Sequence, residues 1–356
     1  MTSAHNDSEL AEFERKSATE DADIETIKRA ILANQARVAK ASGQPLARGT
    51  HAKGVCVRAK FEVLDVTNAV GNRALADRLA RGLFARPGTY SAFVRFANAG
   101  TRHLPDTDAE LRACSFSIEV PPDASASGAT RVDFAMNSAP TFTTNDAHAF
   151  VVAASVAFAD GFLEKAKAFL AMSFDDKRSL RRTLQIIKKQ TRQTPRLPYQ
   201  KLRYWSTVPF THGAGEVVKY SLIPAADNPS RPLQKTPNCL RDELVRHVDE
   251  DDRMSEFEFA LQFLDVEQMT CQGKRHEPSF WVENANVEWM ETESPFHVVA
   301  HLRLLPKSAL LPHECEVFAI DVTEHPMPDS RPIGSVNRAR WAAEAASREA
   351  RLARWR

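Results

Sequence analysis

A histidine with an arginine close before it stands ahead of the first strand-like stretch of this chain. The segment reads RGTHAKG over residues 48–54, so that Arg48 precedes His51 by three positions. Imidazole groups carry acid–base chemistry, and guanidinium groups bind anions. Gly49 and Gly54 allow a bulky group to approach the backbone closely. The segment alone is also compatible with an ordinary structural or surface histidine, so its function depends on partners from elsewhere in the chain.

Common local motifs for chemistry are missing from the sequence. It has no GxGxxG or GxxxxGK stretch for nucleotide phosphates, no GxSxG, and no histidine pair with HExxH spacing. The scattered histidine, cysteine and acidic residues can meet at a metal only through the fold. Any site must therefore be assembled from distant segments.

Alternation of apolar and polar residues predicts the strands that would hold such a site. After His51, Val55, Val57 and Phe61 alternate with polar residues at a period of two, which is typical of a strand with one buried face. The histidine would therefore lie just before the first strand, at one end of a sheet. Further strand-like stretches cover residues 91–97, 113–120, 131–136, 204–210, 217–224, 257–266, 280–289 and 296–306.

Helical spacing separates these strands and also occurs at both ends of the chain. It covers residues 24–40, 67–86, a long region from about 146 to 172, and the chain from Val336 onward. The densely basic run over 174–203 is typical of a solvated helix face rather than of a nucleic-acid surface. We expect an N-terminal helical arm over 1–44 and one domain over 45–356.

The distribution of strands decides the fold class. They are spread over the whole length and mostly alternate, as antiparallel strands do. A doubly wound parallel sheet would require strict alternation of strands with helices. The sequence therefore predicts an α+β fold, an antiparallel β-barrel of about eight strands with helical insertions and a C-terminal helix.

Composition limits the partners. Lys+Arg number 47 and Asp+Glu 46, so no global field recruits nucleic acid or an acidic membrane. No stretch approaches the roughly 18 apolar residues that a membrane-spanning helix needs, and the polar N-terminus has no apolar leader. The five cysteines are widely spaced, with no CxxC pair. We expect a cytoplasmic protein in a reducing compartment, without nucleic-acid partners or a membrane span.

Four segments together resemble motifs of the heme catalase family, in the same order and at similar separations. They are RGTHAKG (48–54), PGTYSAFVRFAN (87–98), DFAMNSAPTFTTND (133–146) and RPIGSVNRAR (331–340). The match resembles most closely the short, core-only branch of catalase-related peroxidases. It covers roughly residues 45–350.

The resemblance implies heme b (iron protoporphyrin IX) buried beside the barrel. His51 matches the distal histidine that moves a proton between the two peroxide oxygens. Asn137 matches the distal asparagine, whose amide hydrogen-bonds the peroxide.

The same resemblance assigns residues that contact the porphyrin. Arg48 and Arg95 match arginines that pair with heme propionates. Phe150 matches the aromatic residue against the porphyrin, Thr50 takes the small-residue position over its distal face, and Phe142 would line the approach channel.

The proximal side departs from the family pattern. The family provides a tyrosine phenolate to the iron from an Arg-x-x-x-Tyr motif, and the equivalent spacing from Arg340 leads to Glu344. Glu344 would then be the iron ligand, kept ionised by Arg340. Alternatively, it is a helix residue in a protein that has lost heme.

Two main functions follow from the resemblance. The first is a heme enzyme that disproportionates hydrogen peroxide, or that reduces or rearranges an organic hydroperoxide, the latter suggested by the Thr50–His51 pair. The second is a catalase-fold protein without iron that serves as a binding or scaffold module. A third, more distant reading is lipid or partner binding by the apolar helix over 150–172. The family also implies a homo-oligomer.

Overall fold

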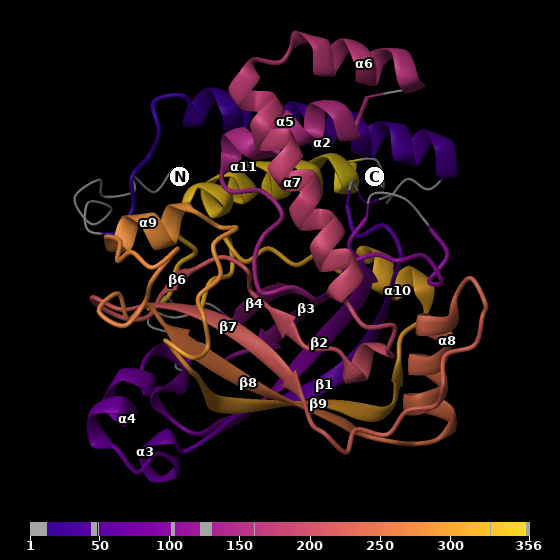
Figure 1. Ribbon diagram of the computed structural model, residues 1–356. Helices are drawn as coiled ribbons and strands as arrows, with labels where there is room; N and C mark the ends of the chain where they lie inside the picture. Colours follow the sequence, from indigo (N-terminus) through magenta and orange to yellow (C-terminus); the bar gives the residue numbers. More distant parts are fainter. Residues whose placement is uncertain are drawn as a thin grey trace.

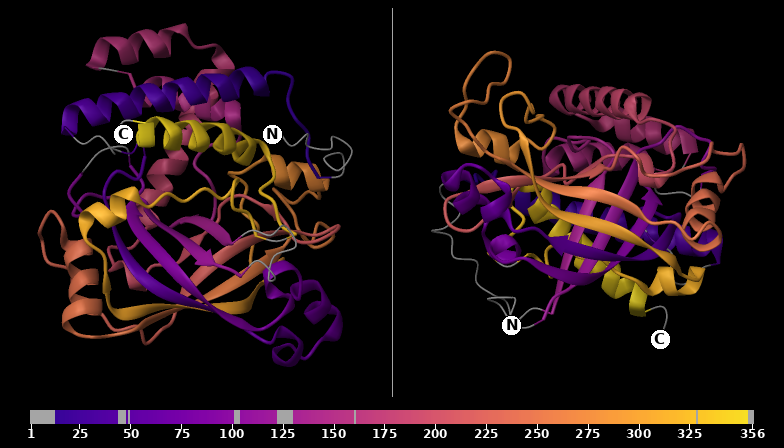
Figure 2. Two further views of the ribbon diagram at one scale, coloured as in Figure 1. Left: turned by 180° about the vertical axis from the view of Figure 1, so that it is seen from behind. Right: turned by 90° about the horizontal axis from the view of Figure 1, so that it is seen from below.

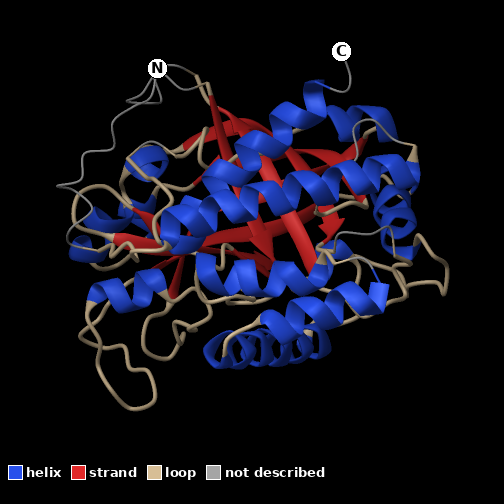
Figure 3. Ribbon diagram, turned by 90° about the horizontal axis from the view of Figure 1, so that it is seen from above, coloured by secondary structure: helices blue, strands red, loops and turns tan. Residues whose placement is uncertain are grey.

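A barrel of strands lies below a layer of helices in the computed structural model of this chain (Figure 1). The structure describes residues 13–43, 48, 50–100, 104–121, 130–159, 161–327 and 329–353. Gly49, and residues 1–12 and 44 of the predicted N-terminal arm, lie outside these residues. Figure 3 shows the helices lying across the strands when the molecule is seen from above.

Eight antiparallel strands close into the barrel. Their order is β5-β4-β3-β2-β1-β9-β8-β7, and β5 also pairs with β7, which completes the ring, while β6 is an added partner of β7. The predicted antiparallel barrel with helices is therefore confirmed. The strands are β1 (Gly54–Val63), β2 (Gly88–Asn98), β3 (Arg112–Glu119), β4 (Arg131–Asn137), β5 (Tyr204–Trp205), β6 (Phe210–Thr211), β7 (Val217–Pro224), β8 (Ser255–Phe263) and β9 (Phe296–Ala309).

Aromatic rings fill the barrel interior. The ring centroids of Phe116 and Phe134 lie 4.7 Å apart, and those of Phe61 and Phe259 lie 5.3 Å apart. All four side chains are at most 3% exposed. Since successive strand residues point to opposite faces, the period of two in the sequence directs these rings inward. The interior is thus a packed core, and the room for a ligand lies outside it, next to the helices.

Most of the helices form a layer that covers the barrel on one side. Figure 2 shows α2 and α11 running side by side over the barrel when the molecule is seen from behind. The helices and helical turns are α2 (Glu20–Ser42), α3 (Val66–Ala69), α4 (Arg73–Leu79), η1 (Gly82–Ala85), α5 (Ala147–Ala157), α6 (Gly161–Ala171), α7 (Phe174–Gln193), η3 (Tyr199–Lys201), α8 (Cys239–Val245), η4 (Arg246–Glu250), α9 (Pro278–Glu283), α10 (Pro312–Val317) and α11 (Ser335–Ala353).

Four predicted elements are wrong in kind or extent. The helix expected over 67–86 is divided into α3, α4 and η1, and the strand expected over 204–210 is divided into β5 and β6. The stretch over 280–289 is not a strand, because its first residues belong to α9, which begins with Pro278 in the first turn. Proline has the backbone angle of a helix and no amide hydrogen to lose there. The single helix expected over 146–172 is two helices, and α6 begins at Gly161, whose φ of 74° is left-handed. Such a residue does not continue a right-handed helix.

The widely spaced cysteines gave no sign of a disulfide, but two of them form one. Cys56 of β1 and Cys315 of α10 form a disulfide, although 259 residues separate them in sequence. Free thiols remain at Cys114, Cys239 and Cys271. The pair lacks any local spacing signal, because only the packing of α10 against β1 brings the two sulfurs together.

One arginine of α11 ties the N-terminal segment to the domain. Arg338 makes ion pairs with Glu14 at 2.5 Å, Glu20 at 2.5 Å and Glu283 at 2.9 Å. Glu14 and Glu20 are 7% and 2% exposed. The carboxylates of the arm therefore depend on this guanidinium for their burial. The boundary between residues 44 and 45 stays a prediction.

Replacing Arg338 with alanine is expected to lower the free energy of unfolding by about 3–5 kcal/mol, because it leaves the buried carboxylate of Glu20 without its partner. Glu14 would retain its ion pair with Arg331. Urea denaturation of the variant and the unmodified protein measures this difference. Arg73, whose side chain is 94% exposed beside Asp77, provides the control. Its alanine variant should change stability by less than about 1 kcal/mol. Equal stability of the two variants would contradict the structural role of Arg338.

Candidate functional site

A cavity of about 270 Å³ is lined by side chains from the barrel, from the helices and from the segment after α10. This volume is near the lower end of the range, roughly 300–1,000 Å³, of small-molecule pockets. Every site residue predicted from the sequence lines it. These residues are Arg48, Thr50, His51, Arg95, Asn137, Phe142, Phe150, Arg340 and Glu344.

The backbone of His51 is held in an uncommon conformation. Its φ of 53° lies in the left-handed region, which is costly for residues other than glycine and is enriched at functional sites. The guanidinium of Arg95 donates a hydrogen bond to the His51 carbonyl at 2.9 Å. The ring nitrogen Nδ1 of His51 lies 3.2 Å from the hydroxyl of Thr50. Neighbours on both sides thus fix the imidazole at the cavity wall.

The imidazole of His51 is neutral over most of the pH range. Burial, together with the charges of Arg95, Arg340 and Arg48, lowers its pKa to about 4, whereas the side chain of Asn137 acts in the opposite direction. His51 and Asn137 both line the cavity. A neutral imidazole can accept a proton, which an imidazolium cannot.

Two buried arginines, Arg95 and Arg351, and the partly buried Arg48 form a cationic cluster in the cavity. Burial, followed by the charge of a neighbouring arginine, lowers the pKa of Arg48 to about 9 and that of Arg351 to about 10. The pKa of Arg95 is also lowered by burial. Glu316 is the acidic neighbour that opposes these shifts in all three. The cluster therefore has an excess of positive charge.

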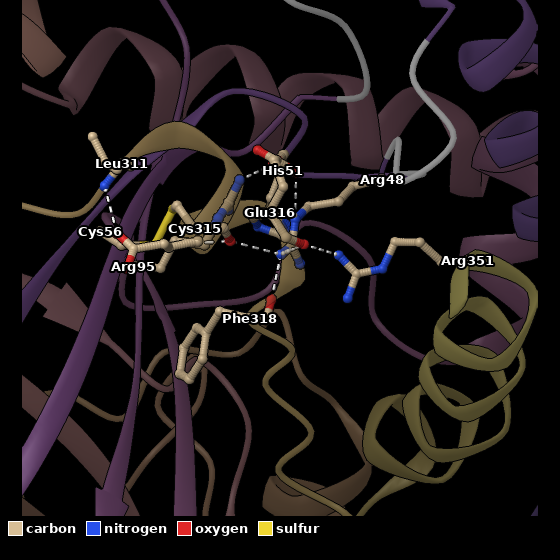
Figure 4. The surroundings of a disulfide bond; sticks show 10 residues. Arg48, His51, Cys56, Arg95, Leu311, Cys315, Glu316, Phe318 and Arg351 are labelled. Carbon is tan, nitrogen blue, oxygen red and sulfur yellow. Dashed lines mark hydrogen bonds and ion pairs between the residues drawn. A yellow bond between two sulfur atoms is a disulfide. The ribbon is translucent and has the colours of Figure 1, made fainter. Parts of the chain in front are cut away.

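The contacts of these arginines leave donors free. Arg48 and Arg351 both donate to the carbonyl of Glu316, at 3.2 and 2.9 Å (Figure 4). Within the described parts of the chain, however, the Nε atoms of Arg48 and Arg95 are buried without a hydrogen-bond partner. Buried donors without a partner are costly. The cluster is thus suited to an anionic group that provides acceptors.

The cavity wall formed by α11 carries the pair Arg340 and Glu344, four residues apart. The Nε of Arg340 lies 3.0 Å from Oε1 of Glu344, as expected for residues on one helix face. Burial nevertheless raises the pKa of Glu344, although Arg340 lowers it. The carboxyl group therefore favours its neutral form more than an exposed glutamate does.

Apolar side chains cover the remaining walls. Phe142 and Phe150 lie on the cavity together with Val336, Ala339 and Ala343 of α11. The two alanines of α11 are buried and small, which leaves room beside Arg340 and Glu344. The cavity therefore combines apolar walls with a cationic cluster.

Sequence reasoning missed Arg348, Arg351 and Phe318, which also line the cavity. A signal for the two arginines was available, since Arg340, Glu344, Arg348 and Arg351 recur at helical spacing on one face. Phe318 follows α10 in an irregular segment, and no periodicity indicates it.

The described residues contain no helix with the length and apolar composition of a membrane span. Nor do those residues include a group of three or more histidine, cysteine or acidic side chains that could hold a metal ion.

Comparison with solved structures finds catalases. A fungal catalase and catalase A from Saccharomyces cerevisiae each match 86% of this chain with a TM-score of 0.62 and 14% sequence identity, over 60% and 61% of their own lengths. A bacterial catalase matches 89% of the chain and 60% of its own length, with a TM-score of 0.62 and 15% identity. No protein-family sequence model matches, and neither does any curated protein sequence. The chain thus has the catalase fold and spans about three fifths of the length of these catalases.

Proposed function

We propose that this catalase-fold chain binds heme b in the cavity and acts on hydroperoxides. The observation that carries the proposal is the convergence on one cavity of all nine side chains selected from the sequence. They come from segments as distant as residues 48 and 344. Hydrogen peroxide and organic hydroperoxides are the proposed substrates.

The residues present fit a heme in three respects. The buried Nε of Arg95 has no hydrogen-bond partner among the described residues, and the Nε of Arg48 lies no closer than 3.6 Å to the carboxylate of Glu316; porphyrin propionates would provide acceptors for both. The surplus positive charge of the cluster with Arg351 suits two carboxylates. Phe142 and Phe150, with the small residues of α11, offer apolar surface to a flat ring.

Bound heme would supply a redox-active iron for cleavage of the O–O bond. Neutral His51 would accept the proton of the hydroperoxide oxygen and return it to the leaving oxygen. The amide of Asn137 would donate a hydrogen bond to the same substrate. Arg95, through the His51 carbonyl, would hold the imidazole in place.

We expect kcat/KM for peroxide to fall as the pH is lowered through about 4, because His51 has its pKa near that value and loses its ability to accept a proton once charged. Above this pH the imidazole is neutral, so activity should show no loss near the ordinary histidine value of about 6.5. A pH–rate profile of the heme-loaded protein measures the inflection. A midpoint near 6.5 would show that His51 is not protected from protonation.

Several finer features belong to the same proposal. Thr50, next to His51, leaves room for an organic hydroperoxide as well as hydrogen peroxide, and the chain resembles the short catalase-related branch. Assembly into a homo-oligomer is proposed from the resemblance alone. A cytoplasmic location is also retained as a proposal, although the Cys56–Cys315 disulfide argues against it, since such bonds are rare in reducing compartments.

The absorption spectrum of the purified protein, before and after addition of heme, tests the proposal together with peroxide decay in the same cuvette. A Soret band that persists through gel filtration, with peroxide consumption above that of free heme, is the expected result. No retained band would overturn heme binding. A band without peroxide consumption would overturn the enzymatic function.

One observation favours a second candidate, a catalase-fold binding module without heme. Glu344 replaces the tyrosine of the family motif, already pairs with Arg340 at 3.0 Å, and has a raised pKa. A neutral carboxyl group is a poor metal ligand, because metal binding requires the deprotonated form. The cationic cluster would then bind another carboxylate-bearing apolar molecule, and the same spectrum decides between the candidates.

A further inference from the structure

The helix α6 exposes large apolar side chains instead of burying them. Phe162 is 84% exposed, Leu163 and Leu170 are each 74% exposed, and Phe169 is 45% exposed. None of the residues of α6 is buried. Single exposed apolar residues are ordinary, whereas a contiguous group of them marks an interaction surface.

These side chains share one face of the helix. At about 100° per residue, Phe162, Leu163, Phe169 and Leu170 fall within one third of the circumference. Lys165 and Lys167 lie on the two borders of this face. Apolar residues bordered by lysines are typical of helices that lie in the interface of a bilayer. Lysine can extend its ammonium group to the lipid headgroups while its stem stays apolar.

The following helix, α7, continues this surface with positive charge. Phe174, at its start, is 74% exposed. Arg178, Arg181, Lys188 and Arg192 follow it at intervals of three, four or seven residues, which places them on one face. All four are exposed. Within the described ranges, none of them makes an ion pair.

Two cation–π contacts join the apolar and basic parts at the junction of the helices. The ammonium of Lys177 lies 5.5 Å from the ring centre of Phe169, and the guanidinium of Arg178 lies 5.2 Å from that of Phe174. The aromatic rings and the cations thus form one continuous surface. We name this surface, formed by α6 and by Phe174, Arg178, Arg181, Lys188 and Arg192 of α7, the α6–α7 face.

The position of α6 leaves this face accessible. Figure 1 shows α6 at the top of the molecule, farther from the barrel than α2, α5 and α11. Figure 2 shows the same arrangement from behind. A flat surface can therefore approach α6 without meeting the barrel.

We infer that the α6–α7 face docks on a bilayer that contains anionic phospholipids. The apolar side chains of α6 would enter the headgroup region, and the cations of α7 would attract the negative lipid surface. A second copy of the chain is a poorer partner. In a two-fold contact the same patch meets itself, so the lysines of α6 and the arginines of α7 would oppose one another.

Flotation with vesicles tests the inference. The full chain is mixed with vesicles of phosphatidylcholine alone or with added phosphatidylserine. We expect binding to the anionic vesicles and little binding to the neutral ones, and we expect added salt to weaken it. The variant Phe162→Ser/Leu170→Ser should lower partitioning at least about tenfold. Arg181→Glu/Lys188→Glu should lower it selectively for anionic vesicles.

Matched variants keep the test specific. Met254 and Met290 are 49% and 45% exposed outside α6, and Met254→Ser/Met290→Ser should bind like the unmodified protein. Because all these side chains are on the surface, the variants should fold, as circular dichroism checks.

Three results would overturn the inference. The first is that the unmodified chain fails to bind anionic vesicles or binds neutral ones equally well. The second is that the α6 variant binds as tightly as the control variant. The third is that sedimentation velocity without lipid reveals a dimer which Phe162→Ser/Leu170→Ser dissociates, because a second copy would then cover α6.

Discussion

Replacing His51 with alanine is expected to lower hydroperoxide turnover by about 10²- to 10⁴-fold, the usual contribution of general acid–base catalysis, and to leave heme bound. The reason is that His51 lies beside Asn137 and is neutral near pH 7, whereas the groups suited to the propionates belong to Arg48 and Arg95. Turnover is measured as peroxide decay, and heme content as the Soret absorbance per chain.

A second histidine provides the control for this experiment. His148 pairs with Asp23 and Asp176 and has a half-exposed side chain, so His148→Ala should retain full turnover. If His51→Ala also retained turnover with heme bound, His51 would have no part in the proton transfer. Loss of heme in this variant would instead assign it a role in binding.

Replacing Glu344 with alanine is expected to shift or abolish the Soret band and to weaken heme binding at least about tenfold, as removal of groups around a bound metal commonly does. In the proposed arrangement, Glu344 occupies the position of the tyrosine in the family motif, and its carboxylate would provide the oxygen ligand to the iron. Glu344→Tyr should restore a phenolate and yield a different, stable spectrum. Titration of the apoprotein with heme measures both effects.

The matched control lies on the same helix. Glu349 is exposed on α11 and is not among the cavity-lining residues, so Glu349→Ala should leave the spectrum unchanged. If Glu344→Ala had the spectrum and affinity of this control, Glu344 could not be the iron ligand. If neither the unmodified protein nor Glu344→Tyr bound heme, the heme-free binding module would be the better conclusion.

The barrel could be predicted because its strands carry their own signal. In β1, alternation from Val55 to Val63 gives the buried face directly, and the same holds for the middle of β9. In β3 and in the second half of β2, nearly every residue is buried. Breaks between helices and short helices were harder to predict from the sequence. Nothing local in α9 except Pro278 distinguishes it from a strand, since Phe280, Trp281 and Val282 are all residues that favour strands. Their packing with Met269 and Trp289 decides the outcome.

The sequence could predict which residues line the cavity, but not their backbone conformation or their contacts. Motif resemblance selected residues that the fold does bring to one cavity, although their roles stay predictions. The left-handed backbone of His51, the pairing of Arg340 with Glu344, and the cluster of Arg48 with Arg351 depend on tertiary contacts. The disulfide between Cys56 and Cys315 depends on tertiary contacts as well. The two cysteines are 259 residues apart, so no local spacing pattern predicts their pairing.

The way the barrel closes has a consequence for the site. β5 is two residues long, and its bridge to β4 is the single pair Asn137 and Trp205. The ring is thus shut, on this side, by the backbone of a candidate site residue. Local unfolding begins where few contacts hold an element. Transient separation of β4 from β5 would therefore displace Asn137 before the core unfolds. A ligand in contact with Asn137 would accordingly stabilise the pairing of β4 with β5 and slow the local unfolding that exposes the interior.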